Sequence, residues 1–217
     1  MIIFEGVSKD FKTRNGRKTV LRDVSIEFPE GRNIGIFGLN GAGKSTLIKI
    51  LAGAEAPDKG RVIRQGLVSF PLGFDSCFHH SMTGRENVRF IARVYGLNVD
   101  ETVDYVQWFA EIGSYFDMPM NTYSSGMRSK LAFGTCLAVN FDVYLIDEIT
   151  EVGDSRFRRK ALQEFQKRVL HADIILVSHN IDTIRNYCDM GAVLHDGSLT
   201  LYNSLEGAME HYKVLAG

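Results

Sequence analysis

Eight consecutive residues have the types and spacing of a phosphate-binding loop: Gly38-Leu39-Asn40-Gly41-Ala42-Gly43-Lys44-Ser45, with Thr46 next. Glycines allow successive backbone N–H groups to turn inward onto phosphate oxygens, and the N-terminus of a following helix adds positive partial charge. In such a loop Lys44 reaches the β- and γ-phosphates, and the Ser45 hydroxyl is a ligand of Mg²⁺. The pattern therefore predicts a nucleotide-phosphate site.

The segments on either side have the character that such a loop requires. Asn33–Phe37 is a short apolar run typical of a buried strand, and Thr46–Ala52 is apolar at helical spacing and ends before Gly53. At ordinary residue frequencies a chain of this length contains the loop pattern by chance about once in a hundred. The alternative, a glycine-rich turn without a ligand, is disfavoured further by the flanking strand and helix.

An acidic pair, Asp147-Glu148, follows the nearly all-apolar run Val143–Ile146. Parallel sheets bind ligands beyond the carboxyl ends of their strands, so these acids are predicted beside the phosphate loop. Asp147 is then a ligand of Mg²⁺, directly or through water, and Glu148 is the general base for the attacking water. His179 follows the apolar run Ile174–Val177 and is predicted to stabilise the γ-phosphate. Alternatively, Asp147 and Glu148 are two solvated acids at a strand end and His179 has only a structural role.

Apolar runs alternate with helical patterns along the rest of the chain, which predicts an α/β fold whose parallel sheet is covered on both faces. Near the N-terminus a polar, basic turn over 12–18 is expected between antiparallel strands at 2–4 and 24–28. Thr83 and Glu86 form a capping-box pattern that opens a helix. Further strands are expected at 61–64, 67–70, 192–194 and 198–201, and helices at 83–95, 99–112, 124–139, 157–169 and 205–214, with a hairpin turn at Asp196-Gly197.

Composition is that of an ordinary soluble globular protein. The 217 residues are enough for one core, and 45% are hydrophobic and 24% charged. A net charge of −1 argues against broad nucleic-acid binding, which usually leaves a basic surface. No apolar run approaches the roughly eighteen residues that cross a bilayer, and no secretory leader is visible. The three scattered cysteines indicate small thiols in a reducing compartment, so we expect a cytosolic chain that meets a membrane only through a partner.

In their order the motifs resemble those of the nucleotide-binding subunits of ATP-binding cassette (ABC) transporters, over nearly the whole chain. Gly38 to Thr46 match the Walker A loop, and Val143 to Glu148 match Walker B with its catalytic glutamate. Tyr123–Met127 matches the signature segment, Asp154 the D-loop aspartate and His179 the switch histidine. The resemblance implies a P-loop ABC-type ATPase fold with an antiparallel β-subdomain and a helical subdomain beside the parallel core sheet. We expect one such domain over 1–217, with its helical part at about 83–140.

The resemblance also implies what the site binds. Two copies of the chain would hold two molecules of ATP head to tail, with Ser125 and Gly126 addressing the γ-phosphate of the opposite subunit from a helix N-terminus. Phe11 by itself is more typical of a core residue, whereas the family places an adenine-stacking aromatic at its position. Hydrolysis would remove the γ-phosphate that joins the copies, and this switch would drive a polytopic membrane permease. The implied nucleotide contacts are Phe11, Gly38, Asn40, Gly41, Ala42, Gly43, Lys44, Ser45, Thr46, Ser125, Gly126 and Asp154, with Ser45 and Asp147 on Mg²⁺.

Two segments depart from the family pattern. Ser125 and Met127 replace a glycine and the glutamine of the signature, and the Q-loop glutamine is missing, with Leu72 near its position. The segments 71–74, 81–87 and 152–154 resemble the polysaccharide-export branch, above all ATPases that export capsular polysaccharide across the inner membrane of Gram-negative bacteria. O-antigen exporters often carry a C-terminal carbohydrate-binding domain, for which this sequence has no room.

The sequence is also compatible with other functions. ATPase subunits of O-antigen or teichoic-acid exporters share the branch. Soluble cassette ATPases of translation or DNA maintenance usually carry two cassettes, a coiled-coil insertion or basic extensions, and none is visible. A scaffold that no longer hydrolyses ATP is favoured by the missing glutamine and disfavoured by Lys44, Asp147, Glu148 and His179. A P-loop GTPase is disfavoured because the sequence has no Asn/Thr-Lys-x-Asp motif.

Overall fold

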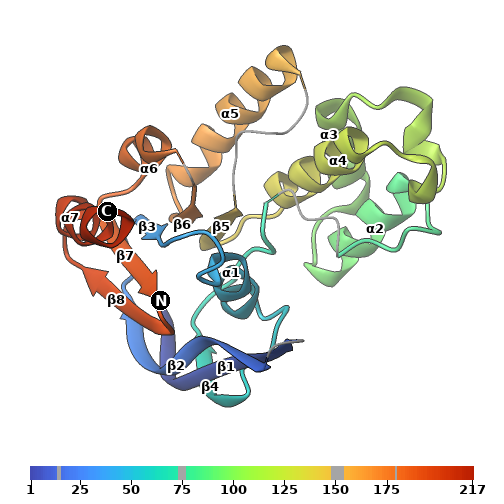
Figure 1. Cartoon of the computed structure of the whole chain (residues 1–217). Helices are drawn as coiled ribbons and strands as arrows, with labels where there is room; N and C mark the ends of the chain where they lie inside the picture. The colour runs from blue at the N-terminus through green and yellow to red at the C-terminus, as the bar shows by residue number, and fades with distance from the viewer. Residues whose placement is uncertain (14–15, 73–76, 148–153, 179) are drawn as a thin grey trace. The chain divides into compact units, whose positions relative to one another are not determined.

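The computed structural model describes residues 1–13, 16–72, 77–147, 154–178 and 180–217. Two compact units share the chain, and each is internally packed (Figure 1). The first comprises Met1–Pro71, Phe141–Glu148 and Ala172–Gly217, and the second comprises Leu72–Asn140 and Ile149–His171. Among the described residues, none of the helices combines the length and the apolar character needed to cross a bilayer.

The first unit contains two sheets. A three-stranded antiparallel sheet has the order β2-β1-β4, and a five-stranded sheet has the order β5-β6-β3-β7-β8. In the larger sheet all neighbours are parallel except the β7–β8 hairpin. The elements of this unit are β1 (Ile2–Thr13), β2 (Gly16–Phe28), β3 (Ile34–Phe37), α1 (Lys44–Ala52), β4 (Lys59–Arg64), β5 (Val143–Asp147), β6 (Asp173–Val177), α6 (Ile181–Tyr187), β7 (Met190–His195), β8 (Ser198–Tyr202) and α7 (Leu205–Ala216).

Both faces of the parallel sheet are covered, as the strand β3 shows. Its Ile34 and Ile36 belong to a hydrophobic core shared with α1 and the antiparallel sheet. Its Gly35 faces the opposite way, and a Cβ there would lie 2.3 Å from Ile184 of α6. Successive side chains of a strand point to opposite faces, so α1 lies on one side of the sheet and α6 on the other. The predicted α/β class with a doubly covered parallel sheet is confirmed.

Helix α7 packs closely on β7, and this contact can be tested by mutation. A Cβ added to Gly191 would lie 2.3 Å from the Cβ of Ala208. We expect Gly191→Ala to lower the free energy of unfolding by about 1–3 kcal/mol, because the two backbones must move apart. The double variant Gly191→Ala/Ala208→Gly should lose less than the sum of the two single changes, measured by urea unfolding. Simple additivity would contradict the contact.

The second unit is helical, and it contains α2 (Gly84–Val94), α3 (Val99–Ala110), α4 (Ser125–Ala138) and α5 (Ser155–Val169), with short 3-10 turns at Gly113–Asp117 and Met120–Thr122. The predicted capping box is present: Thr83 accepts from the N–H of Glu86, and Glu86 accepts from the N–H of Thr83. Phe109 of α3 stacks on Phe133 of α4 and meets Phe157 of α5 edge to face. These rings hold the helices together, since aromatic pairs add to the burial of their area.

Two local predictions are wrong, and one helix was missed. The segment 67–70 is not a strand: only Val68 bridges β5, and the Ser69 hydroxyl, in place of a backbone carbonyl, accepts from the N–H of Leu145 at 2.9 Å. The turn expected over 12–18 is largely strand, because the ladder of β1 and β2 continues to the pair Thr13 and Gly16. Helix α6 was not predicted, since seven residues are too few to show a helical period.

Candidate nucleotide-binding site

The phosphate loop, residues Gly38–Ser45, connects β3 to α1 as its sequence predicts. Helix α1 begins after Gly43 with no side-chain cap and no acid in its first turn. Each of the other described α-helices has a Thr, Ser, Asn or Asp side chain that accepts from its first backbone N–H groups. The start of α1 therefore carries no side-chain cap and no acid, and the positive partial charge of this helix N-terminus suits an anion.

Lys44 is held within the loop. Its side chain is 8% exposed in total, and its Nζ donates to the carbonyl oxygens of Gly38 at 2.7 Å and Leu39 at 3.1 Å. A charged donor that bridges two carbonyls of its own loop is fixed in position, which reduces the entropy lost when a phosphate binds.

The strand β2 packs directly on the loop. Gly43 has φ = 108°, and a Cβ there would lie 2.3 Å from Val20 of β2. Gly41 has φ = 78°, and a Cβ there would lie 3.5 Å from the Nζ of Lys18 on the same strand. Both conformations are ones that L side chains rarely adopt, so glycine is required for the turn and, at Gly43, also for the contact.

Asp147 is the last residue of β5 and pairs with Val177, the last residue of β6. Only β6 separates β5 from β3, so Asp147 and the phosphate loop leave the same edge of the parallel sheet about 10 Å apart. This separation leaves room for a phosphate chain and a cation. Glu148 and His179, predicted as base and γ-phosphate sensor, lie outside the described residues; in the sequence Glu148 is the next residue after β5, and His179 is the second residue after β6.

The donors present fit a magnesium ion. Mg²⁺ is usually held by one or two protein oxygens together with substrate phosphates and water, and Ser45 and Asp147 provide a hydroxyl and a carboxylate. The described residues contain no cluster of three or more His, Cys, Asp or Glu that would hold a metal without a substrate.

Phe11 lies near the free end of the antiparallel sheet and is 38% exposed, so it is not the core residue that its type alone favours. The ammonium of Lys9 stands 5.2 Å from the ring centroid. Lys9 is buried; it donates to the carbonyl of Ala56 at 2.8 Å and forms ion pairs with Glu55 and Asp58. The hydrogen bond to Glu55 is the main reason that the pKa of Lys9 is raised. The Lys9 ammonium lies over the Phe11 ring, and the exposed part of this side chain is open to a partner.

The other predicted contacts lie in the second unit. Ser125 and Gly126 are the first residues of α4, after Ser124, whose hydroxyl accepts from the N–H of Met127. Asp154 caps α5, because its Oδ1 accepts from the N–H groups of Phe157 at 2.9 Å and Arg156 at 3.0 Å. The bond from Phe157 is the main cause of a lowered pKa of Asp154. The structure thus gives Asp154 a local role that its sequence position did not reveal.

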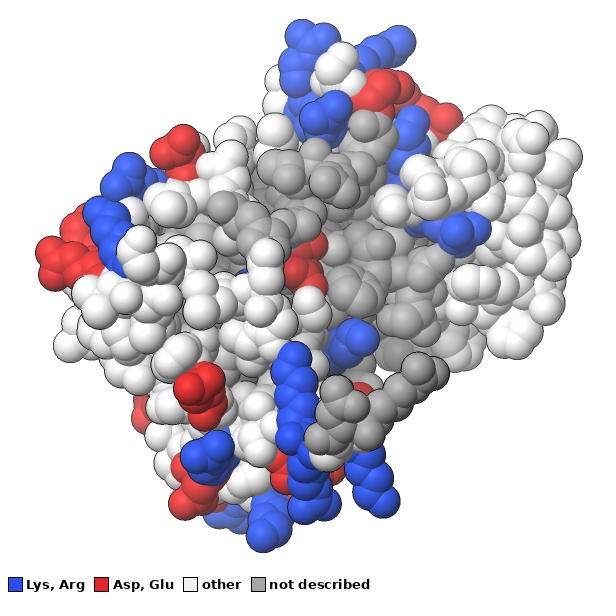
Figure 2. Space-filling view, in the orientation of Figure 1, with Lys and Arg blue, Asp and Glu red and all other residues white. Residues whose placement is uncertain are grey.

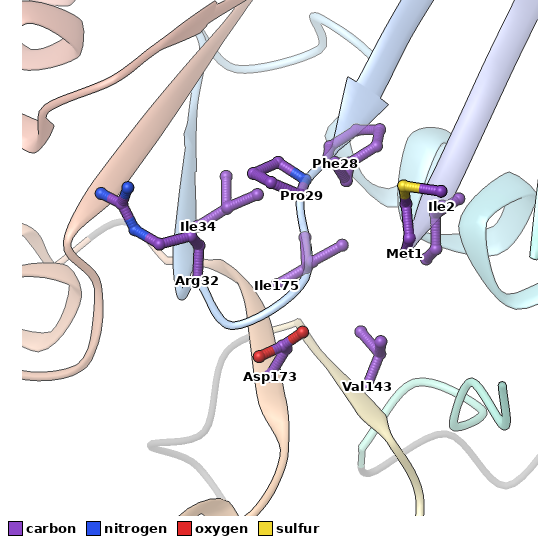
Figure 3. A pocket seen from close by; sticks show the side chains of 9 residues that line it. All are labelled: Met1, Ile2, Phe28, Pro29, Arg32, Ile34, Val143, Asp173 and Ile175. Atoms are coloured by element: carbon purple, nitrogen blue, oxygen red, sulfur yellow. The ribbon is translucent and has the colours of Figure 1, made fainter. Parts of the chain in front are cut away.

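A small hollow of the first unit lies away from the phosphate loop and is too small for a nucleotide. Met1, Ile2, Phe28, Pro29, Arg32, Ile34, Val143, Asp173 and Ile175 line it (Figure 3). Val143 and Asp173 begin β5 and β6, so this hollow lies at the amino edge of the sheet, opposite to the phosphate loop. The volume in which the centre of a water molecule can lie is about 10 Å³, so the hollow holds at most one water molecule.

Sequence reasoning missed Lys9, Lys18 and Val20, which surround the loop or the Phe11 ring. Their positions depend on how β1 and β2 pair and where their sheet packs, and nothing in the local pattern of residue types indicates this. The predicted residues Gly38–Thr46, Asp147 and Phe11 all belong to the first unit, with the loop and Asp147 at one sheet edge.

A glycine loop between a parallel strand and an uncapped helix, with a carboxylate at a nearby strand end, defines a P-loop nucleotide-binding protein. Comparison with known sequences shows which family of P-loop proteins the chain belongs to. The profile of the ABC transporter family matches residues 21–151. The chain belongs to the ABC transporter family.

Individual relatives of this family are similar to the chain over nearly its whole length. The polysialic acid transport ATP-binding protein KpsT of Escherichia coli is 45% identical over 98% of this chain and 99% of its own. The capsule polysaccharide export ATP-binding protein CtrD of Neisseria meningitidis serogroup B is 44% identical over 99% of this chain and 100% of its own. ATP-binding proteins of O-antigen and teichoic acid export systems match at 33–36% identity. The dimeric post-hydrolysis structure of the cassette MJ0796 with ADP and Pi has the same fold, with a TM-score of 0.74 at 22% identity over 92% of this chain and 96% of that one.

Proposed function

We propose that the chain is the ATP-hydrolysing subunit of an exporter that moves capsular polysaccharide across the inner membrane of a Gram-negative bacterium. It would act as one nucleotide-binding domain over 1–217 with a helical subdomain at about 83–140. The proposal places it at the cytoplasmic face of that membrane, bound to a polytopic permease, with no nucleic-acid partner.

The observation that carries the proposal is the near-full-length identity to KpsT and CtrD, whose names state polysialic acid transport and capsule polysaccharide export. Identity to O-antigen and teichoic acid proteins is lower, which makes those polymers the second candidates.

The residues of the first unit have distinct roles in this proposal. Phe11 stacks on adenine, the backbone N–H groups from Gly38 to Thr46 surround the phosphates, and Lys44 supplies charge to the β- and γ-phosphates. Ser45 and Asp147 hold Mg²⁺, which neutralises charge that develops on the phosphate oxygens. Glu148 accepts the proton of the attacking water, and His179 stabilises the γ-phosphate.

A second copy of the chain completes the proposed site. Ser125 and Gly126 open the exposed N-terminus of α4, where backbone N–H groups suit the γ-phosphate of a nucleotide held by the other copy. Asp154 would lie at the same junction. Because ATP bridges the copies and ADP does not, hydrolysis would open the dimer and move the permease.

The function is tested by deleting the gene in its host. We expect polymer synthesis to continue and capsular polysaccharide to accumulate inside the cell, measured with a polymer-specific antibody on intact and permeabilised cells. A plasmid copy of the natural gene should restore surface polymer, and a copy with Glu148→Gln should not. Normal surface capsule in the deletion strain, with loss of O-antigen or teichoic acid, would replace the proposal by its alternative.

A further inference from the structure

A second lysine, besides Lys44, lies at the phosphate loop. Lys18 and Val20 are two residues apart on β2, and both reach the loop: Val20 meets Gly43, and the Nζ of Lys18 lies 3.5 Å from where a Cβ of Gly41 would be. Val20 is buried and Lys18 is exposed. Val20 thus makes a buried apolar contact with the phosphate loop, and Lys18 places a positive charge at the solvent-exposed side of the same loop.

The ammonium of Lys18 forms no hydrogen bond or ion pair with any residue that the structure describes. Two other basic residues of the antiparallel sheet have acidic partners: Arg61 pairs with Glu5, and Lys9 pairs with Glu55 and Asp58. Figure 2 shows Lys and Arg side chains gathered around this sheet, at the bottom of the view, with acids among them. Lys18 keeps its full charge available at a loop whose N–H groups already favour an anion.

The register of the hairpin places Lys18 beside the proposed base site. Phe11 of β1 is the direct partner of Lys18 on β2. Directly opposed residues of an antiparallel pair project from the same face of the sheet, with Cβ atoms about 5 Å apart. Lys18 therefore stands between the aromatic ring and the phosphate loop, where the phosphate chain of a nucleotide stacked on Phe11 must pass.

We propose that Lys18 binds the phosphate chain of the nucleotide held by its own subunit, as a second cation that complements Lys44. This inference rests on the proposed function, because it takes a nucleoside triphosphate as the ligand. Lys44 is enclosed by its own loop, whereas Lys18 approaches from the neighbouring sheet and is exposed. Its contribution is accordingly smaller and sensitive to salt.

The test compares four lysine variants in one binding assay. Lys18→Gln is expected to weaken ATP binding roughly 3- to 10-fold at low ionic strength and less at high ionic strength, because salt screens an exposed charge. Lys18→Arg should retain the natural affinity, since it keeps the charge. Lys12→Gln is the matched control: Lys12 is exposed on the same hairpin, but it neighbours Phe11 in the strand and so points to the opposite face.

Affinity is measured by titration calorimetry with ATP, and thermal unfolding of each variant shows that the fold is intact. Unchanged ATP affinity in Lys18→Gln, or an equal loss in Lys12→Gln, would overturn the role of Lys18. Lys44→Ala in the same assay separates this result from failure of the proposed function. If the natural protein binds no ATP, the nucleotide site itself is wrong and the inference falls with it.

Discussion

Turnover of ATP is expected to fall on the order of 10²–10⁴-fold when Glu148 is replaced by glutamine, while ATP binding is retained. Glutamine has nearly the shape of glutamate but accepts no proton, so the attacking water loses its base. The nucleotide contacts on the phosphate loop are untouched by the change. Because the γ-phosphate then persists, the two copies should remain joined, and the variant should form a dimer that depends on ATP.

Phosphate release and light scattering after size exclusion measure the two parts of this prediction. Glu206→Gln is the control, since it makes the same chemical change at an exposed position on α7 and should leave turnover unaltered. Natural turnover in Glu148→Gln would remove Glu148 from the role of base. Slow turnover without an ATP-dependent dimer would contradict the proposed arrangement of two copies.

Replacement of Lys44 by alanine should weaken ATP binding by roughly 10- to 100-fold, because one or more charged hydrogen bonds to phosphate are lost, each worth about 1.5–3 kcal/mol. Turnover should fall by a further factor on the order of 10²–10³, since the same charge stabilises the transferring phosphoryl group. The variant also loses the bonds from Nζ to the carbonyls of Gly38 and Leu39, so a small decrease in thermal stability is expected.

Calorimetry with ATP, together with a thermal unfolding curve, distinguishes loss of binding from loss of fold. Lys213→Ala, which removes an exposed lysine from α7, is the control and should bind ATP normally. If Lys44→Ala is folded and binds ATP with natural affinity, Gly38–Ser45 is not the phosphate-binding loop.

The missing Q-loop glutamine affects which groups can hold Mg²⁺ in the proposed site. Leu72, near the expected position, is 4% exposed and so belongs to the apolar interior. A buried leucine offers no ligand to Mg²⁺ and no hydrogen bond to water. In the proposed mechanism the ion therefore relies on Ser45, Asp147 and the phosphates, which makes the Asp147 carboxylate more important than it would be with a further protein ligand.

Much of the fold was predictable because the signals are local. A capping box needs only Thr83 and Glu86, three residues apart, and both of its hydrogen bonds are present. Asp196 and Gly197 have φ of 45° and 82°, the left-handed conformations that a two-residue hairpin requires and that this pair of residue types favours. The apolar composition of segment 67–70 resembles a strand, but its backbone pairs with β5 only around Val68, and beyond that point the Ser69 hydroxyl accepts from the N–H of Leu145.

The phosphate loop, the carboxylate at the end of β5 and the alternation of strands and helices could be predicted from the sequence, because each depends on residues adjacent in the chain. The position of β6 between β5 and β3, and the placement of Lys9, Lys18 and Val20 around the loop and the Phe11 ring, depend on the packing of the folded chain. Strand order and sheet packing are set by the burial of apolar surface across long sequence separations. Many pairings satisfy the same local pattern of residues, and the one that buries the shared core best determines which side chains meet at the site.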